Sequence, residues 1–154
     1  MEDLKNFYKN KKVLVTGATG FKGAWLCKWL TMMGSKVIGI GYNPNKNKNY
    51  FYQLNLNKKI KLNLFDIKNY NKLNNLIKKN NPSIIFHLAA QPLIYESYHK
   101  PLLTFDVNFR GSMNIVDLAR KYKSIKSVII VTSDKCYESN FSSKGFKEND
   151  LLGG

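Results

Sequence analysis

Arginine and acidic residues are both scarce in this chain of 154 residues. Only 2 of its 25 basic residues are arginine, 23 are lysine, and 10 residues are acidic, which gives a formal net charge of +15. Nucleic-acid sites favour arginine, because its planar fork bonds bases and phosphates through two hydrogen bonds at once. The lysines are spread along the chain together with 19 asparagines, which indicates a compositional bias. We therefore expect no nucleic-acid partner.

Cysteine and long apolar runs are scarce as well. The two cysteines, Cys27 and Cys136, have neither Cys-x-x-Cys nor metal-ligand spacing, so we expect two free thiols and no metal site. No apolar run approaches the roughly 18 to 20 residues that cross a bilayer. No secretory apolar stretch follows Met1. These absences predict a cytoplasmic protein without a membrane partner.

Short β-rich runs alternate with helical segments along the chain. The predicted strands are 12–16, 36–41, 60–65, 83–88 and 127–132, and the predicted helices are 21–33, 69–79 and 101–122. Residues 42–59 are rich in Asn and Lys and predict a surface loop with room for one helical turn. Because the strands are nearly continuous apolar runs, both faces of the sheet should be covered. The pattern predicts an α/β fold with a doubly wound parallel sheet, as one domain over residues 1–154.

Two predicted helices carry apolar residues at helical spacing. In the first, these are Phe21, Trp25, Leu26, Trp29, Leu30 and Met33. In the long helix, they are Leu102, Phe105, Phe109, Met113 and Val116. Gly34 and Asn81-Pro82 predict the ends of the first two helices, and Pro101 suits the first turn of the third.

A glycine-rich run follows the first predicted strand and opens the first helix. It is Thr16-Gly17-Ala18-Thr19-Gly20-Phe21-Lys22-Gly23, with the spacing G-x-x-G-x-x-G. Glycine permits a tight turn and lets the backbone approach a pyrophosphate closely. The free N–H groups of the helix N-terminus then favour the phosphate charge. The run predicts a dinucleotide site; the alternative is a plain strand-to-helix turn.

Asp66-Ile67 ends the third predicted strand. Its carboxylate could accept a hydrogen bond from an adenine amino group, or it could serve as the N-cap of the next helix. The acidic residue expected after the second strand for the ribose hydroxyl is missing, since that strand ends Ile40-Gly41-Tyr42-Asn43. Lys46 and Lys48 lie nearby, so this position leaves the choice between NAD and NADP open.

The fourth predicted strand ends in His87-Leu88-Ala89-Ala90-Gln91. Its small residues leave room for a dinucleotide to cross the strand tips. We expect His87 to be a satisfied core histidine and His99 to lie at the surface. Asn108, within the long helix, either reaches back to fix the backbone near the cofactor or lies on a solvated face.

The fifth predicted strand ends in Val131-Thr132-Ser133-Asp134-Lys135-Cys136-Tyr137-Glu138. This run brings a hydroxyl, a carboxylate and an amine to the end of the sheet where ligands bind. Acid–base chemistry on a bound substrate needs such a cluster. The alternative is a capped loop with a surface ion pair.

Together, the runs at Thr16 to Gly23, His87 to Leu93 and Thr132 to Glu138 resemble the extended short-chain dehydrogenase/reductase superfamily. Within it, the chain resembles the CDP-glucose 4,6-dehydratase family from about Lys11 to Gly154. The most specific piece is Ser133 to Glu138. The related dTDP-glucose dehydratases carry an Asp-Glu pair where this chain has Asp134-Lys135.

The resemblance implies a tightly held NAD and an internal redox cycle on a nucleotide-sugar substrate. Hydride leaves C4 of the glucose, water is lost across C5 and C6, and hydride returns to C6. By the same resemblance, Thr132 would contact the cofactor and Ser133 would hydrogen-bond the 4-oxygen. Asp134 would be the acid for the departing 6-hydroxyl, and Lys135 would assist proton removal at C5.

By the same resemblance, the family's Tyr-x-x-x-Lys pair is expected within a few residues after Gly154, and the substrate-binding part follows it. We therefore expect an N-terminal portion that is inactive alone, and a homodimer through the long helix in the complete protein. One alternative is a nucleotide-sugar epimerase or reductase, which needs no elimination acid such as Asp134. Another is a dinucleotide-binding module without catalysis. The residues that would contact the nucleotide base are expected outside this chain.

Overall fold

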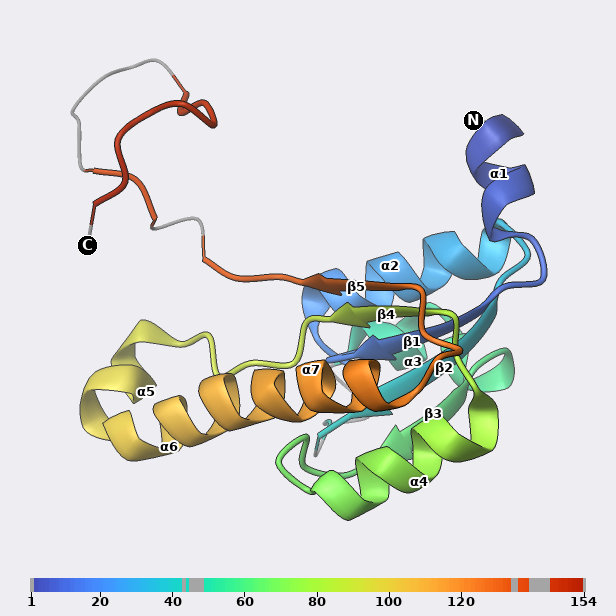
Figure 1. Cartoon of the computed structure of the whole chain (residues 1–154), viewed down its shortest axis with the longest axis horizontal. Coiled ribbons are helices and arrows are strands. Elements are labelled where there is room, and N and C mark those ends of the chain that lie inside the picture. The colour runs from blue at the N-terminus through green and yellow to red at the C-terminus, as the bar shows by residue number, and fades with distance from the viewer. Residues whose placement is uncertain (1, 43, 45–48, 134–135, 139–144, 154) are drawn as a thin grey trace.

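The structure, a computed structural model, describes residues 2–42, 44, 49–133, 136–138 and 145–153 (Figure 1). The strands are β1 (Lys12–Thr16), β2 (Lys36–Gly41), β3 (Lys61–Leu64), β4 (Ile84–His87) and β5 (Ser127–Ile130). The α-helices are α1 (Glu2–Tyr8), α2 (Phe21–Met32), α3 (Tyr50–Gln53), α4 (Tyr70–Asn80), α5 (Ile94–His99), α6 (Pro101–Phe105) and α7 (Gly111–Lys121). A 3-10 turn, η2, covers Leu56–Lys58, and a π-helical turn, η3, covers Asp106–Arg110.

The strands form one five-stranded parallel sheet in the order β3-β2-β1-β4-β5. From β1 the chain moves outward to β2 and β3, then returns to β4 and β5 on the other side of β1. Right-handed crossovers therefore place α2 and α3 over one face, and α4 and α7 over the other. Figure 1 shows α2 and α7 on opposite sides of the strands. This is the doubly wound parallel sheet that the sequence predicts.

An apolar layer lies on each face of the sheet, and alternate residues of β1 pack into the two layers. Val13 and Val15 belong to the layer under α2 and α3, whereas Leu14 belongs to the layer under α4 and α7. The first layer is completed by residues such as Leu30 and Phe51. The second contains Ile77 and Ile115, among others. A central strand buried on both faces explains why its sequence is a continuous apolar run.

The aromatic residues of the predicted apolar stripe of α2 are exposed although Leu30 and Met33 are buried, and the whole stripe predicted for the long helix is exposed. Helix α2 buries Gly23, Ala24, Cys27 and Leu30, while Phe21, Trp25 and Trp29 are exposed. Helix α7 buries Ile115 and Leu118, while Leu102, Phe105, Phe109, Met113 and Val116 are exposed along α6, η3 and α7. Helical periodicity gave the secondary structure correctly, but the large residues do not mark the face that packs on the sheet.

Several element boundaries agree with the sequence-based expectation. Gly34 ends α2 with φ +80° and Asn81 ends α4 with φ +48°. Pro101 occupies the first turn of α6. Cys27 is buried and Cys136 exposed, and both are free thiols. Burial raises the pKa of Cys27 to about 12. No helix in the described ranges is long and apolar enough to span a bilayer.

In residues 42–59 the helical turn allowed for in the expected surface loop is present as α3, but the surface position was wrong for the second half. Residues 50–58 form α3 and η2, and Phe51 and Leu56 are fully buried. Asn49 caps α3 by accepting a hydrogen bond from the Phe51 N–H at 3.0 Å. The abundance of Asn and Lys in this segment concealed the apolar residues that pack into the core. Helices α1 and α5 were also missed, and neither contains a buried residue that would give it an apolar period.

Candidate functional site

The carboxyl ends of all five strands lie at one edge of the sheet, because the strands are parallel. The order in which strands are added to the sheet reverses between β1 and β4, which are parallel, hydrogen-bonded neighbours. In open α/β sheets, ligands bind outside the strand ends at such a switch point. The segments that follow β1, β3, β4 and β5 meet there, and they contain every candidate site residue except Asn108.

Gly17 lets the glycine-rich turn lie directly against the end of β4. Its φ is +68°, and a Cβ at this position would come within 2.7 Å of the Leu88 carbonyl carbon and 2.8 Å of the Ala89 nitrogen. Gly23 lies inside α2, and the turn requires a glycine there because a Cβ on Gly23 would collide with the Gly17 carbonyl oxygen. These two glycines therefore close the turn on itself and on β4.

Gly20 differs from the other two glycines of the turn. It is exposed, it precedes α2 as the N-cap with extended backbone angles, and its N–H donates to the Gly17 carbonyl at 2.9 Å. The nearest heavy atom to an added Cβ would be the Gly17 oxygen at 3.2 Å. Its outer side is thus open, beside the first N–H groups of α2, which have no acceptor within the helix. An anion could approach the backbone here.

Thr19 and Phe21 are tied to the segment that begins at Asn49. The Asn49 side-chain amide donates to the Thr19 carbonyl at 2.7 Å. The Phe21 ring packs edge-on to Tyr50 at 5.3 Å between centroids. Lys22 is exposed at the start of α2. The role of Asn49 was not predicted, since nothing distinguishes it from the other asparagines of 43–49.

Asp66 lies just beyond β3 and is not the N-cap of α4. That position belongs to Asn69, whose side chain accepts the Lys72 N–H at 3.0 Å. One Asp66 oxygen, Oδ1, accepts the Lys68 N–H at 2.9 Å, and Oδ2 lies 3.7 Å from Lys68 Nζ. Ile67 is buried against Gly111. The hypothesis that Asp66 caps the next helix is therefore wrong, and its carboxylate remains a hydrogen-bond acceptor at the end of β3.

Both ends of the segment after β4 are anchored by side chains. Thr16 Oγ1 accepts the N–H groups of Leu88 at 3.2 Å and Ala89 at 3.1 Å. Asn108 accepts the Gln91 N–H at 2.7 Å and donates to the Gln91 carbonyl at 3.2 Å. Asn108 thus reaches back to fix this backbone, which was one of the two hypotheses drawn from the sequence. Ala90, between the anchors, is exposed.

His87 is a buried core residue, 2% exposed, as expected, but the expectation that its hydrogen bonds are satisfied was wrong for one ring nitrogen. Its Nδ1 lies 2.7 Å from Thr16 Oγ1. Because Thr16 Oγ1 already accepts two N–H groups, its own proton is assigned to Nδ1, so His87 carries its proton on Nε2. Within the described residues, Nε2 has no hydrogen-bond partner. Burial lowers the pKa of His87 to about 4, so the ring is neutral at pH 7.

Thr132 and Ser133 follow β5 and are exposed at the same edge. The Val131 N–H donates to the His87 carbonyl at 3.0 Å, which holds this segment beside the end of β4. Asp134 and Lys135 lie outside the described residues. His99 is exposed at the end of α5, as expected.

A parallel sheet with a glycine-rich turn and a helix N-terminus at the switch point defines the dinucleotide-binding Rossmann class of α/β proteins. Residues 14–152 match the family described as GDP-mannose 4,6 dehydratase, and the chain belongs to this family. The sequence resembled the CDP-glucose 4,6-dehydratase family of the extended short-chain dehydrogenase/reductase superfamily, and the match confirms that the chain belongs with the nucleotide-sugar 4,6-dehydratases.

Individual relatives include both dehydratases and epimerases. The chain is 40% identical over 150 residues to CDP-glucose 4,6-dehydratase from Salmonella typhimurium, which covers 97% of this chain and 42% of that protein. It is 30% identical over 145 residues to protein CapI of Staphylococcus aureus, which covers 92% of this chain and 43% of that protein. The chain therefore spans less than half the length of these relatives.

Solved structures give the same result for the fold. An epimerase from Methanothermobacter thermautotrophicus superposes with a TM-score of 0.81 at 26% identity, covering 97% of this chain and 43% of the other. UDP-glucose 4-epimerase from Thermus thermophilus, solved in complex with NAD, superposes with a TM-score of 0.77 at 25% identity, covering 92% and 44%. The chain thus belongs to the superfamily of nucleotide-sugar dehydratases and epimerases.

Gly20→Val tests the phosphate-facing side of the turn. A branched side chain would stand where a pyrophosphate must approach, so we expect the affinity for NAD to fall more than tenfold, about 1.4 kcal/mol or more. Titration calorimetry with NAD measures it. Thermal unfolding is the control, since the extended backbone at Gly20 accepts a side chain. Gly23→Ala should instead destabilise the fold. Unchanged NAD affinity in a folded Gly20→Val protein would refute the role.

The buried His87 should make stability depend on pH. Between about pH 6.5 and 4, the unfolded chain binds a proton at this histidine and the folded chain does not. The free energy of unfolding should therefore fall as the pH is lowered through this window, by on the order of 3 kcal/mol. Urea denaturation of wild type and His87→Gln at several pH values measures the difference. Parallel pH profiles for the two proteins would contradict the assignment.

Proposed function

We propose that this chain forms the NAD-binding part of a nucleotide-sugar 4,6-dehydratase that converts CDP-glucose to CDP-4-keto-6-deoxyglucose. The observation that carries the proposal is the run Ser133-Asp134-Lys135-Cys136-Tyr137-Glu138, which follows β5 in the sequence. The 40% identity to the Salmonella CDP-glucose 4,6-dehydratase supports the same substrate, against 30% or less for the other relatives named by activity.

The residues at the strand ends fit NAD. The open side of Gly20 and the start of α2 would hold the pyrophosphate, with Gly17, Thr19, Phe21, Lys22 and Gly23 shaping the turn. Asp66 and Ile67 would meet the adenine through the carboxylate and a buried apolar contact. The bound NAD would accept hydride from C4 of the sugar and later return it to C6.

The segment after β4 would support the other half of the cofactor. Leu88, Ala89 and Ala90 offer a small-residue surface fixed by Thr16 at one end and by Asn108 at the other. Thr132 would flank it from β5. Holding this backbone in place before the cofactor binds lowers the ordering entropy lost on binding.

Proton transfers would be carried by the residues that follow Thr132. Ser133 would hydrogen-bond the 4-oxygen of the sugar. Asp134 would donate a proton to the departing 6-hydroxyl, and Lys135 would assist removal of the proton at C5. Removing a hydroxyl group needs a donor at C6 and an acceptor at C5, which a carboxyl group and an amine can supply.

An epimerase is the second candidate, because several relatives carry that name, including CDP-paratose 2-epimerase of Salmonella typhi at 30% identity. Epimerisation needs no acid for elimination, so Asp134-Lys135 argues against it. Product analysis separates the candidates: a dehydratase forms a 4-keto-6-deoxy sugar with alkaline absorbance, and an epimerase forms an isomer that retains its 6-hydroxyl.

Asp134→Asn and Lys135→Met, in a complete enzyme containing this chain, test the mechanism. Each should lower turnover of CDP-glucose by about a hundredfold to ten-thousandfold, because a positioned acid or base is removed. Oxidation at C4 precedes elimination, so the absorbance of reduced nicotinamide should still develop in a single turnover. Normal turnover in both variants would make the pair structural. Loss of the reduced-nicotinamide signal in Asp134→Asn would assign Asp134 to oxidation or to substrate binding.

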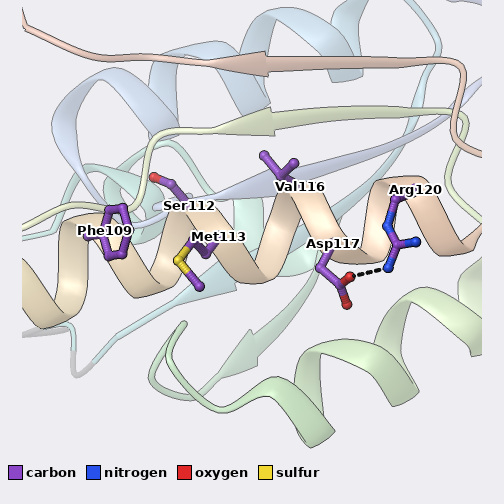
Figure 2. Close-up of a pocket in the computed structure, with 6 residues that line it drawn as sticks. All are labelled: Phe109, Ser112, Met113, Val116, Asp117 and Arg120. Atoms are coloured by element: carbon purple, nitrogen blue, oxygen red, sulfur yellow. Dashed lines mark hydrogen bonds and ion pairs between the residues drawn. The ribbon is translucent and has the colours of Figure 1, made fainter.

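We also propose that the complete protein forms a homodimer through the outer face of η3 and α7. The residues of α7 buried against the rest of the fold are Gly111, Ile115 and Leu118. A shallow surface depression remains on the opposite side, lined by Phe109, Ser112, Met113, Val116, Asp117 and Arg120 (Figure 2). A second copy would cover these apolar side chains, since single helix faces of this kind are removed from water by association.

Sedimentation of the complete protein and of Met113→Glu tests the dimer. Wild type should sediment as a dimer at micromolar concentration, and Met113→Glu should shift toward monomer because a buried unpaired charge opposes association. Met32→Glu is the matched control, as Met32 is an exposed methionine on α2. A wild-type monomer at that concentration would remove the claim.

A further inference from the structure

Lys68 forms an ion pair with the Asp66 carboxylate but donates its short hydrogen bond to Asp106. Lys68 Nζ lies 3.7 Å from Asp66 Oδ2, beyond hydrogen-bond distance, and 2.8 Å from Asp106 Oδ2. Asp66 Oδ1 is occupied by the Lys68 backbone N–H at 2.9 Å. Among the described residues, Oδ2 of Asp66 accepts no hydrogen bond, so it is the oxygen available to a ligand.

Asp106 holds Lys68 firmly. The hydrogen bond to Asp106 is the main reason that the pKa of Lys68 is raised, and the same bond is the main reason that the pKa of Asp106 is lowered. Asp106 also forms an ion pair with Arg110, whose Nε lies 2.7 Å from its other oxygen, Oδ1. Its carboxylate, on η3, therefore stays ionised and keeps Lys68 directed toward the helix.

The backbone of this loop is fixed by other contacts. Asn114 Nδ2 donates to the carbonyls of Ile67 and Lys68, each at 3.2 Å. Ile67 is buried where Gly111 lets α7 come close. A change at Asp106 would therefore release the Lys68 side chain, while the loop that presents Asp66 would stay in place.

We propose that Asp106 is a positioning residue that sequesters Lys68, so that Asp66 Oδ2 remains free to accept the 6-amino group of the cofactor's adenine. The inference rests on the proposed function, in which Asp66 meets the adenine. Without Asp106, the lysine closes the 3.7 Å gap and donates to Oδ2 itself. A charged donor forms the stronger hydrogen bond and displaces a neutral amino group.

Titration calorimetry on this chain tests the proposal with two ligands: NAD, and nicotinamide purine dinucleotide, in which hydrogen replaces the 6-amino group. Asp106→Asn should weaken NAD about tenfold, the order of one lost hydrogen bond. The purine analogue should change less than about twofold. Because the analogue reports a folded site, its unchanged affinity separates the effect from misfolding.

A double variant distinguishes sequestration of Lys68 by Asp106 from the alternative that the two residues only hold the loop in place. Lys68→Met should bind NAD like wild type, and Asp106→Asn combined with Lys68→Met should recover wild-type affinity, because no competing amine is left. If the two residues only clamp the loop, Lys68→Met alone would weaken NAD as much as Asp106→Asn does, and the double variant would not recover. Either result would overturn the proposal. Glu96→Gln is the control, since it removes a carboxylate that pairs with Lys100 at 2.9 Å.

Asp66→Asn distinguishes this inference from the proposed function. It should remove the preference for NAD over the purine analogue. An unchanged preference would show that Asp66 does not meet the adenine, and the proposed adenine site would fail together with this inference. A lost preference in Asp66→Asn, combined with wild-type NAD binding in Asp106→Asn, would overturn the sequestration alone.

Discussion

The close approach of the glycine-rich turn to the end of β4 is the constraint on which the strand-end edge depends. Gly17 touches the backbone at Leu88 and Ala89, and no side chain could occupy its place. Thr16, one residue earlier, bonds the same two N–H groups. Gly17, which has no side chain, and the buried Thr16 hydroxyl thus join β1 to β4 at the switch point, and this junction sets the direction of the helix that follows Gly20.

The fold could be predicted from the sequence because its signals are local. Val13, Leu14 and Val15 form one apolar run, and Gly17 to Gly23 marks the turn into a helix. What could not be predicted depends on tertiary contacts. The π-helical turn at Asp106–Arg110 leaves no mark in side-chain periodicity. Trp25 and Trp29 have the spacing of a core face yet lie outside, since Gly23 and Ala24 are needed where α2 meets the sheet.

The candidate site, like the fold, has residues that local sequence signals predict and residues whose roles depend on tertiary contacts. Gly20, Asp66 and the small residues after His87 were found because they follow strands at positions where ligands bind. The pairing of Asp106 with Lys68 joins residues 38 positions apart, and neither residue stands in a motif. Thr16 belonged to a recognised run, but its role as acceptor for two backbone N–H groups required the register between β1 and β4. Long-range hydrogen bonds carry no signature in a single sequence.

The π-helical turn η3 bonds two separate parts of the strand-end edge at once. Asp106 reaches the loop after β3 through Lys68, and Asn108 holds Gln91 after β4. A displacement of this turn would break both connections together. In the proposed function the two loops hold opposite ends of the dinucleotide, so a shift of this one helical turn would be felt at both ends of the ligand.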